Sequence, residues 1–462
     1  MRKAELRREL DAQLLGEALL SDEGMGVLRE LCDGCGSRFA GSAEEQRAGD
    51  YLLDQFRQAG LGKVHGEPFR FQGWRRGRKP VLRVVAPRRL SVESIALPYC
   101  PPTPQRGLEL ELLWLGEGMP EDFARRRHEV RGKAVMVTSD SPDYYHRWVH
   151  RAEKYARAVA CGAKAFVFMN HYDGLLEATG AIRFNRKAEI PGIGVSREAG
   201  SRILRAAEGG VARIHLATHD KPVAARSRNI VGELRGTQHP DEVVVVGGHY
   251  DGHDISQAAA DNASGVATVV ETARLLALHW GVLKRTVRFV CFGAEEIGLI
   301  GSAAYVARHA DEMPNVRLMV NVDSIGSSRG KGFDFQGWDE AKPRLAAMAG
   351  EMRESIPFAS RPVPYSDHFN FMVAGVPVCC LKSFGGERGR GFGHTAADTV
   401  DKVSRADLRE AAALLARSLV RFANDPAWRL RHKPKAEIRR ILDRYEILDV
   451  LRTEGTLPPA LR

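Results

Sequence analysis

The chain has 462 residues, of which 44% are hydrophobic and 27% are charged. This balance is typical of a globular protein and excludes a mostly disordered chain, a collagen-like repeat and a coiled-coil rod. At about 100–200 residues per domain, the length predicts two or three domains. The formal charge of +10 comes from 68 Lys and Arg against 58 Asp and Glu. We interpret this surplus as a solvated, Arg-rich surface rather than as a sign of a nucleic-acid partner.

The sequence contains no run of about 18 apolar residues, so we expect no membrane-spanning helix. The segment MRKAELRRELDAQLLGEALL carries charges of both signs and lacks the apolar core of a signal peptide, which favours an amphipathic helix. The seven cysteines are odd in number and irregularly spaced, so no disulfide framework is expected. These features predict a cytoplasmic protein, and they leave a homo-oligomer open.

Hydrophobic patterning divides the chain into four segments. Residues 1–97 are typical of helices followed by short extended runs, and we expect them to pack on the domain of residues 228–423. Residues 98–227 contain strand-like runs such as KAVMVTSD and KAFVFMN, which predict a small β-rich insert. Residues 228–423 alternate apolar strands with helices, typical of a largely parallel α/β sheet that is covered on both faces. Residues 424–462 form a basic, Arg-rich tail.

Histidine and carboxylate side chains follow successive strands of the predicted sheet. In such sheets, ligands bind at the carboxyl ends of the strands. The residues at these ends are His249 and Asp251, then Asp261, Glu295 and Glu296, Asp323, and His394 with Asp398 four residues further on. Two imidazoles and several carboxylates, with no cysteine among them, suit Zn²⁺ or a similar cation. The pattern therefore predicts a metal site at one edge of the sheet.

The number of candidate ligands favours two metal ions that share a carboxylate. Two ions about 3.5–4 Å apart bind a bridging water, lower its pKa and polarise a carbonyl group. A carboxylate that binds neither ion must then pass the proton of that water to the leaving group. The adjacent Glu295 and Glu296 are able to divide those tasks. The motif GHYDGHD holds a second pair, His253 and Asp254, and we favour His249 because it follows the strand directly.

The run Ser366-Asp367-His368 suggests a serine hydrolase at first sight. Consecutive residues cannot by themselves form the chain of nucleophile, base and orienting acid that such an enzyme needs. No GxSxG motif accompanies them. We therefore prefer the metal site.

Six sequence blocks resemble the co-catalytic zinc aminopeptidases, the family that includes bacterial leucyl aminopeptidases, aminopeptidase Y, glutamate carboxypeptidase and the transferrin receptor. In chain order they are GHYD, ADNASGVA, FGAEEIGLIGS, VNVDSIG, SDHFNFMVAGVPV and GHTAADT. The segments VRGKAVMV, CGAKAFVF and IPGIGVS resemble the protease-associated domain often inserted in such enzymes. The resemblance implies a zinc-exopeptidase, phosphorylase/hydrolase-like fold: a mostly parallel mixed α/β sheet sandwiched by helices, plus a smaller β-rich protease-associated domain.

The resemblance also implies a role for each candidate residue. Asp261 would bridge two Zn²⁺ ions, or two other divalent ions. His249 and Asp323 would complete one ion's site, and Glu296 and His394 the other. Glu295 would be the general base. The supporting residues would be Asp251, which holds the His249 ring, Asp367 near the site, Asp398, which steadies the His394 loop, and Tyr365, a candidate for stabilising the oxyanion.

The implied function is that of a metal-dependent exopeptidase acting on peptide substrates. The leading hypothesis is an aminopeptidase that hydrolyses the N-terminal peptide bond with a metal-bridging hydroxide. One alternative is other amide chemistry on the same scaffold, such as carboxypeptidase or dipeptidase hydrolysis or glutaminyl cyclisation. Another is a catalytically inactive receptor-like binding protein, which the presence of all five ligand positions and Glu295 argues against.

Overall fold

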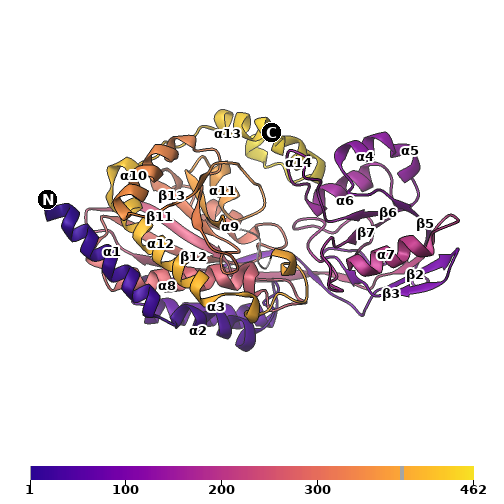
Figure 1. Cartoon of the computed structure of the whole chain (residues 1–462), viewed down its shortest axis with the longest axis horizontal. Coiled ribbons are helices and arrows are strands. Elements are labelled where there is room, and N and C mark those ends of the chain that lie inside the picture. The colour runs from indigo at the N-terminus through magenta and orange to yellow at the C-terminus, as the bar shows by residue number, and fades with distance from the viewer. Residues whose placement is uncertain (1, 386–389) are drawn as a thin grey trace.

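The chain forms two units, each built around its own sheet (Figure 1). The computed structural model describes residues 2–385 and 390–462. One eight-stranded sheet defines the large unit, and a second eight-stranded sheet defines the inserted unit. All strands of the inserted unit fall between β1 (Gly62–Arg75) and β10 (Lys221–Leu234), which pair antiparallel with each other in the large unit. The smaller unit is therefore an insertion between two neighbouring strands of the larger one.

The large unit has a mixed sheet with a parallel centre. Its strand order is β1-β10-β12-β11-β13-β16-β14-β15. The strands not yet bounded are β11 (His239–His249), β12 (Arg285–Phe292), β13 (Val316–Val322), β14 (Lys331–Asp334), β15 (Phe358–Ala359) and β16 (Val378–Ser383). The four central strands, β12, β11, β13 and β16, are parallel to their neighbours in that order. This arrangement confirms the predicted mostly parallel, mixed α/β sheet.

Helices cover both faces of this sheet (Figure 1). One group packs together on one face: α1 (Arg2–Leu20), α2 (Glu23–Arg29), α3 (Ala43–Gln58), α8 (Ser264–Ala277) and α12 (Arg405–Asn424). The opposite side carries α9 (Ile300–Arg308) and α11 (His368–Val373), with α10 (Lys342–Met352) near the sheet's end. Because it is covered on both faces, β11 buries a continuous apolar run, Val243 to Val246, at no more than 4% exposure.

The inserted unit has the strand order β3-β2-β9-β5-β6-β7-β8-β4. Its strands are β2 (Val81–Ala86), β3 (Leu90–Val92), β4 (Ile95–Ala96), β5 (Leu108–Trp114), β6 (Ala134–Thr138), β7 (Ala165–Met169), β8 (Gly192–Val195) and β9 (Arg213–Ala217). Its helices are α4 (Pro120–Arg125), α5 (Arg127–Val130), α6 (Arg151–Ala160) and α7 (Arg197–Ala206). The change of sheet falls between β1 and β2, ahead of the predicted boundary at residue 98. The strand β2 belongs to the inserted unit because it pairs with β9. A contact between segments so far apart in the chain produces no local pattern in the sequence.

The basic C-terminal segment folds into two helices that join the units. They are α13 (Lys435–Arg444) and α14 (Ile447–Glu454), and α14 packs against α6 of the inserted unit (Figure 1). The Arg157 guanidinium lies 3.2 Å from the Asp449 carboxylate across this contact. The backbone carbonyl of Glu454 accepts a hydrogen bond from Arg186 at 3.1 Å. The segment therefore ties the insert to the large unit.

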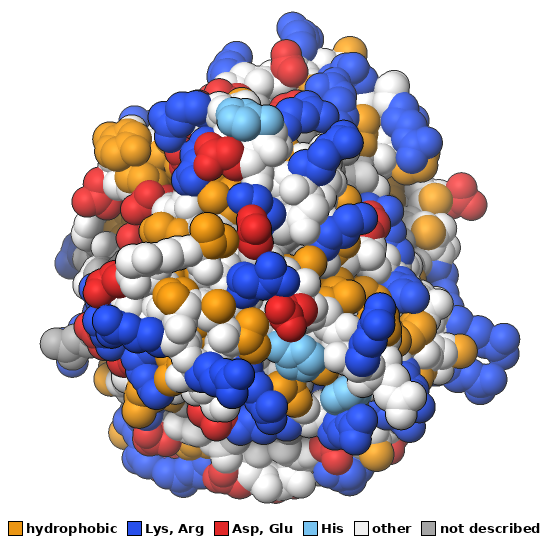
Figure 2. Space-filling view, turned by 90° about the vertical axis from the view of Figure 1, so that its right-hand side faces the viewer, with side chains coloured by type: hydrophobic (Ala, Val, Ile, Leu, Met, Phe, Trp, Pro, Cys, Tyr) orange, Lys and Arg blue, Asp and Glu red, His pale blue; other side chains and the backbone are white. Residues whose placement is uncertain are grey.

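Basic side chains are dispersed over the surface. On the face shown in Figure 2, Lys and Arg lie among acidic and hydrophobic side chains and do not gather in one groove. Arg76, which directly follows β1, is bound in a two-point ion pair with Asp254 at 2.6 and 2.8 Å. All seven cysteines are free. Within residues 2–385 and 390–462, no helix has both the length and the apolarity needed to cross a membrane.

Shortening a buried side chain of α14 tests whether the C-terminal helices stabilise the fold. Leu448 is 1% exposed. We expect Leu448→Ala to lower the free energy of unfolding by about 2–5 kcal/mol, as truncation of buried leucines does. Arg452→Ala, at an exposed position of the same helix, should change it by about 0.5 kcal/mol or less. Urea unfolding followed by circular dichroism measures both, and a wild-type midpoint for Leu448→Ala would refute a stabilising role.

Candidate metal centre

The carboxyl ends of three parallel strands place the candidate ligands at one edge of the large sheet. His249 is the last residue of β11, and Asp323 follows β13 directly. Glu295 and Glu296 lie in the turn after β12. The remaining two come from loops, Asp261 from the turn that leads into α8 and His394 from the segment after β16. The structure thus brings together all six residues that the sequence predicted as ligands or base.

The Asp261 carboxylate lies between two imidazole rings. Its Oδ1 atom is 3.3 Å from His249 Nε2, and its Oδ2 atom is 3.2 Å from His394 Nε2. One carboxylate therefore faces two groups of donor atoms. We name them subsite A (His249, Asp261 and Asp323) and subsite B (Asp261, Glu296 and His394).

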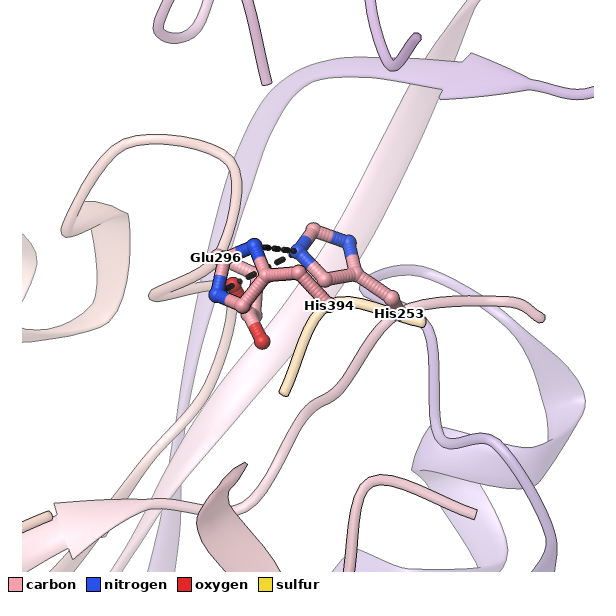
Figure 3. Close-up of side chains that lie close together, drawn as sticks. All are labelled: His253, Glu296 and His394. Atoms are coloured by element: carbon pink, nitrogen blue, oxygen red, sulfur yellow. Dashed lines mark hydrogen bonds and ion pairs between the residues drawn. The ribbon is translucent and has the colours of Figure 1, made fainter. Parts of the chain in front are cut away.

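Each subsite is completed by a further carboxylate. In subsite A, His249 Nε2 lies 3.6 Å from Asp323 Oδ1. In subsite B, His394 Nε2 lies 3.7 Å from Glu296 Oε2. The Glu295 Oε2 atom is 3.9 Å from His249 Nε2, so Glu295 borders subsite A. His253 stands beside subsite B, and Figure 3 shows its ring next to Glu296 and His394.

The donor atoms fit a divalent ion such as zinc. Tetrahedral zinc with bonds of about 2.0–2.1 Å holds its ligand atoms about 3.3 Å apart. The separations within both subsites, 3.2 to 3.7 Å, lie close to that value. The donors are imidazole nitrogens and carboxylate oxygens, the ligand types that zinc takes in catalytic sites. In addition, Glu296 Oε1 is buried without a hydrogen-bond partner among the described residues, as a free metal-ligand oxygen would be.

Asp251 ties the ends of two strands together. Its Oδ1 and Oδ2 atoms accept hydrogen bonds from the backbone N–H groups of Glu295, at 2.9 Å, and Glu296, at 3.2 Å. The same carboxylate lies 3.6 Å from His249 Nδ1, and the Asp251 carbonyl oxygen lies 3.1 Å from that nitrogen. A proton on Nδ1 leaves Nε2 with its lone pair toward subsite A. Asp251 is therefore placed to orient both the His249 ring and the Glu295–Glu296 turn.

Two other supporting residues hold backbone or side chains of the cluster. Asp398 accepts hydrogen bonds from the backbone N–H groups of Ala260, at 2.7 Å, and Asp261, at 3.1 Å. It therefore fixes the Asp261 turn. Its own backbone N–H group donates to the Thr395 carbonyl oxygen at 3.3 Å, next to His394, and its role in steadying the His394 loop stays a prediction. Ser366, from the superficial Ser-Asp-His run, donates a hydrogen bond to Asp323 Oδ2 at 2.6 Å. Its hydroxyl thus holds a candidate ligand in place.

The last two predicted supporting residues are Tyr365 and Asp367. The Tyr365 hydroxyl donates a hydrogen bond to Glu454 of α14 at 2.9 Å, and its ring stacks on His150 at 4.1 Å. The contact we observe for this hydroxyl is therefore with the C-terminal segment and not with a carboxylate of either subsite. Asp367 is fully buried, and burial raises the pKa of its carboxyl group to about 7.

The charges of the cluster strongly shift its protonation. Burial raises the pKa of Glu295 well above the ordinary value and that of Glu296 to about 8. Burial alone would lower the pKa of His249, but the surrounding carboxylates, Glu295 first, hold it well above its ordinary value. Likewise, burial would raise the pKa of Asp261, but His249 and His394 hold it well below the ordinary range. Such opposing shifts among close groups are typical of catalytic sites.

Two arginines that lie at or near this site were not predicted from the sequence. Arg38 is completely buried, and its guanidinium donates to the carbonyl oxygens of Tyr250, Gln257 and Ala258, at 2.9 Å each. It thereby fixes the loop that follows His249. Arg151, from α6 of the inserted unit, lies near enough to the cluster for Glu296, Glu295 and Asp261 to oppose the lowering of its pKa by burial. Neither lies in a recognisable motif, because each acts through contacts that join distant parts of the chain.

The fold and the site together define a metal-dependent hydrolase built on an α/β sheet. Residues 229–419 match peptidase family M28, and residues 109–203 match the PA domain. Residues 229–419 therefore form a peptidase family M28 domain, and the chain is a metallopeptidase with an inserted PA domain.

Individual relatives extend the similarity beyond these two domains. The chain is 28% identical over 405 residues to aminopeptidase YwaD of Bacillus subtilis, covering 84% of this chain and 82% of that protein. It is 28% identical over 323 residues to human carboxypeptidase Q, covering 68% and 66%. A peptidase M28 precursor from Shewanella amazonensis has the same fold, with a TM-score of 0.80 and 23% identity over 93% of this chain and 99% of that one. The zinc aminopeptidase BSAP from Bacillus subtilis superposes with a TM-score of 0.68 at 22% identity, over 88% and 97%.

Without bound metal, the buried carboxyl groups should make the free energy of unfolding depend on pH. In chelated protein, Asp367 has a pKa of about 7 against an ordinary 3.8, so the folded state holds a proton that the unfolded state releases. Stability is then lost as the pH rises through 7, by about 1 kcal/mol between pH 6 and 8.5. We expect Asp367→Asn to reduce this loss. Urea unfolding in excess chelator at both pH values measures it, and an equal pH slope in wild type and variant would contradict the expectation.

Proposed function

We propose that the protein is an aminopeptidase that uses two zinc ions to hydrolyse the N-terminal peptide bond of peptide substrates. The observation that carries this proposal is the Asp261 carboxylate, which faces His249 with one oxygen and His394 with the other. A carboxylate in that position is what two adjacent ions require as a bridge. When bound, the ions would supply an activated water and polarise the scissile carbonyl group.

The residues of this chain would divide the remaining work. His249 and Asp323 would hold the ion of subsite A, and Glu296 and His394 that of subsite B, with Asp261 shared. Glu295 would hold and move the proton at Oε2, because it borders subsite A and is 9% exposed. Its raised pKa suits a group that carries a proton between the attacking water and the leaving amine. Asp251 would keep Glu295 in place through the hydrogen bond to its backbone N–H group.

The names of the relatives support this reading without deciding the substrate. One relative is named an aminopeptidase, and a structural neighbour is named a zinc aminopeptidase. Another relative, of similar identity, is named a carboxypeptidase. The identity of the metal, the number of ions and the end of the peptide that is recognised are therefore part of the proposal.

Replacing the proposed base tests the mechanism. We expect Glu295→Gln to lower kcat on an amino-acid arylamide by about 10²–10⁴-fold, because the amide cannot accept the proton. Metal content should stay at two equivalents per chain, because the proposed ligands are intact. Glu208→Gln, at an exposed position of the inserted unit, serves as the matched control. Full activity of Glu295→Gln would sink the assignment, and cleavage of N-blocked peptides alone would sink the aminopeptidase proposal.

A second candidate function, cleavage of dipeptides or of other substrates with a free carboxylate near the scissile bond, is favoured by Arg151. This first residue of α6 is 8% exposed, and its Nε atom donates to the Ala181 carbonyl oxygen at 3.1 Å. The guanidinium lies against Gly180, and the N–H group of Thr179 donates to the His394 carbonyl oxygen at 2.9 Å. Arg151 is therefore next to the backbone that contacts a candidate ligand.

The charge of Arg151 has no counterion at contact distance. Among the described residues, no carboxylate lies within ion-pair distance of its guanidinium, although Glu296 and Glu295 are close enough to oppose the lowering of its pKa by burial. A buried charge without a partner is costly, by several kcal/mol. Metal ions in both subsites would neutralise the nearby carboxylates and leave Arg151 free for a substrate anion. A peptide C-terminus is the anion that a peptidase substrate carries.

Comparing a dipeptide with its C-terminal amide tests this second candidate. If Arg151 binds the carboxylate, wild-type kcat/KM should be about 10–100-fold higher for the dipeptide, the value of one or two hydrogen bonds to a charged group. Arg151→Met should bring the ratio close to one, whereas Arg202→Met, at an exposed position of α7, should leave it unchanged. Equal wild-type cleavage of both substrates would rule out this role and favour the aminopeptidase.

A further inference from the structure

We propose that His253 is a positioning residue for metal binding in subsite B, and that it accepts a hydrogen bond from His394 Nδ1. The inference rests on the proposed metal centre. It assigns a role to the second histidine of the GHYDGHD motif, next to the five candidate ligands. The two histidines of that motif would then serve different subsites, His249 as a ligand of one and His253 as a support of the other.

His253 contacts two residues of subsite B through its Nε2 atom. This atom lies 3.0 Å from His394 Nδ1 and 2.9 Å from Glu296 Oε2. Figure 3 shows the two rings meeting edge to face, with a centroid distance of 4.4 Å and an interplanar angle of 64°. His253 is 2% exposed, so water does not compete freely for these contacts. The other nitrogen of His394, Nε2, faces Asp261.

Metal binding fixes which nitrogen of each ring carries its proton. An ion bound at His394 Nε2 requires the lone pair of that nitrogen, so the proton of the neutral ring must lie on Nδ1. That N–H group points at His253 Nε2, which must then present a lone pair as the acceptor. Metal-ligating histidines depend on such a partner for ring orientation and basicity. His253 thus plays toward His394 the part that Asp251 plays toward His249.

The loop of His253 is held firmly enough to act as a support. The next residue, Asp254, is bound through both carboxylate oxygens by Arg76 at the end of β1. Arg38 fixes the carbonyl oxygens of Tyr250, Gln257 and Ala258 on either side of the loop. Two arginines from distant segments therefore set the position of the His253 ring, which lies four residues beyond the end of β11.

The proposed tautomer leaves one donor without a protein partner, and its Nε2 lone pair faces Glu296 Oε2 at 2.9 Å, a repulsion that an ion bound to Glu296 would relieve. With its lone pair on Nε2, the His253 ring carries its proton on Nδ1, which is buried and has no hydrogen-bond partner among the described residues. A glutamine at this position offers an amide oxygen to accept from His394 Nδ1 and an amide N–H group to donate to Glu296 Oε2. A phenylalanine fills a similar volume and offers neither. The two substitutions therefore separate hydrogen bonding from packing.

Zinc titration of the chelated full-length protein by calorimetry tests the inference. In wild type we expect two equivalents. His253→Phe should weaken one of them by about 10–100-fold, the usual cost of losing a group that orients a metal ligand. The other equivalent should keep its affinity. His253→Gln should restore the weakened equivalent to within a few-fold of wild type, and His239→Gln, at the exposed start of β11, should change neither.

The possible outcomes separate this inference from the proposed function. Two unchanged equivalents in His253→Phe would overturn the role of His253 and leave the two-metal proposal intact. His253→Gln as weak as His253→Phe would also overturn it, because hydrogen bonding to His394 would then not be what the residue supplies. Binding of no zinc, or of a single equivalent, by wild-type protein would instead contradict the proposed two-metal centre itself. Asp254→Asn, which weakens the ion pair with Arg76, should lower the affinity of the same equivalent as His253→Phe, by a smaller factor.

Discussion

The concentration of negative charge at one edge of the large sheet is the constraint on which this structure depends. Asp251, Glu295 and Glu296 are buried and Asp261 is half-buried, and burying an unpaired carboxylate is costly. Each is offset by a specific group: a backbone N–H, an imidazole nitrogen or a retained proton. Bound cations would complete this compensation. The site is therefore poised to bind metal because of the same charges that make the metal-free protein sensitive to pH.

The surrounding fold supplies rigidity to that edge through interactions between distant segments. Backbone donors to Asp251 join the ends of β11 and β12, and Asp398 fixes the turn of Asp261 from a loop 137 residues away. Arg38, from the segment between α2 and α3, donates hydrogen bonds to carbonyl oxygens of the loop after β11. Orientation of this kind holds ligand atoms in place before an ion arrives, and it lowers the reorganisation needed for catalysis.

The inserted unit contributes residues next to the metal centre. His150, the N-cap of helix α6, stacks its ring on Tyr365, and Arg151, the first residue of that helix, lies close enough to the acidic cluster for Glu296 and Glu295 to oppose the lowering of its pKa by burial. Helix α14 closes the arrangement from the C-terminal side, where Glu454 accepts the Tyr365 hydroxyl. Three parts of the chain thus meet at Tyr365. Selectivity between the two ends of a peptide is expected to depend on residues outside the metal ligands, since those ligands are common to both reactions.

The sequence by itself determined the α/β class, the PA-type insert and the set of residues at the carboxyl ends of the strands. Apolar runs and the polar residues that end them are local patterns, so they can be read without coordinates. Only the tertiary structure decided the rest: that β2 belongs to the insert, that α14 joins the units, that Asp398 holds the Asp261 turn, and that Arg38, Arg151 and His253 surround the site. These depend on pairings between residues far apart in the chain, and a single sequence carries no local signal for which distant partner a buried side chain will meet.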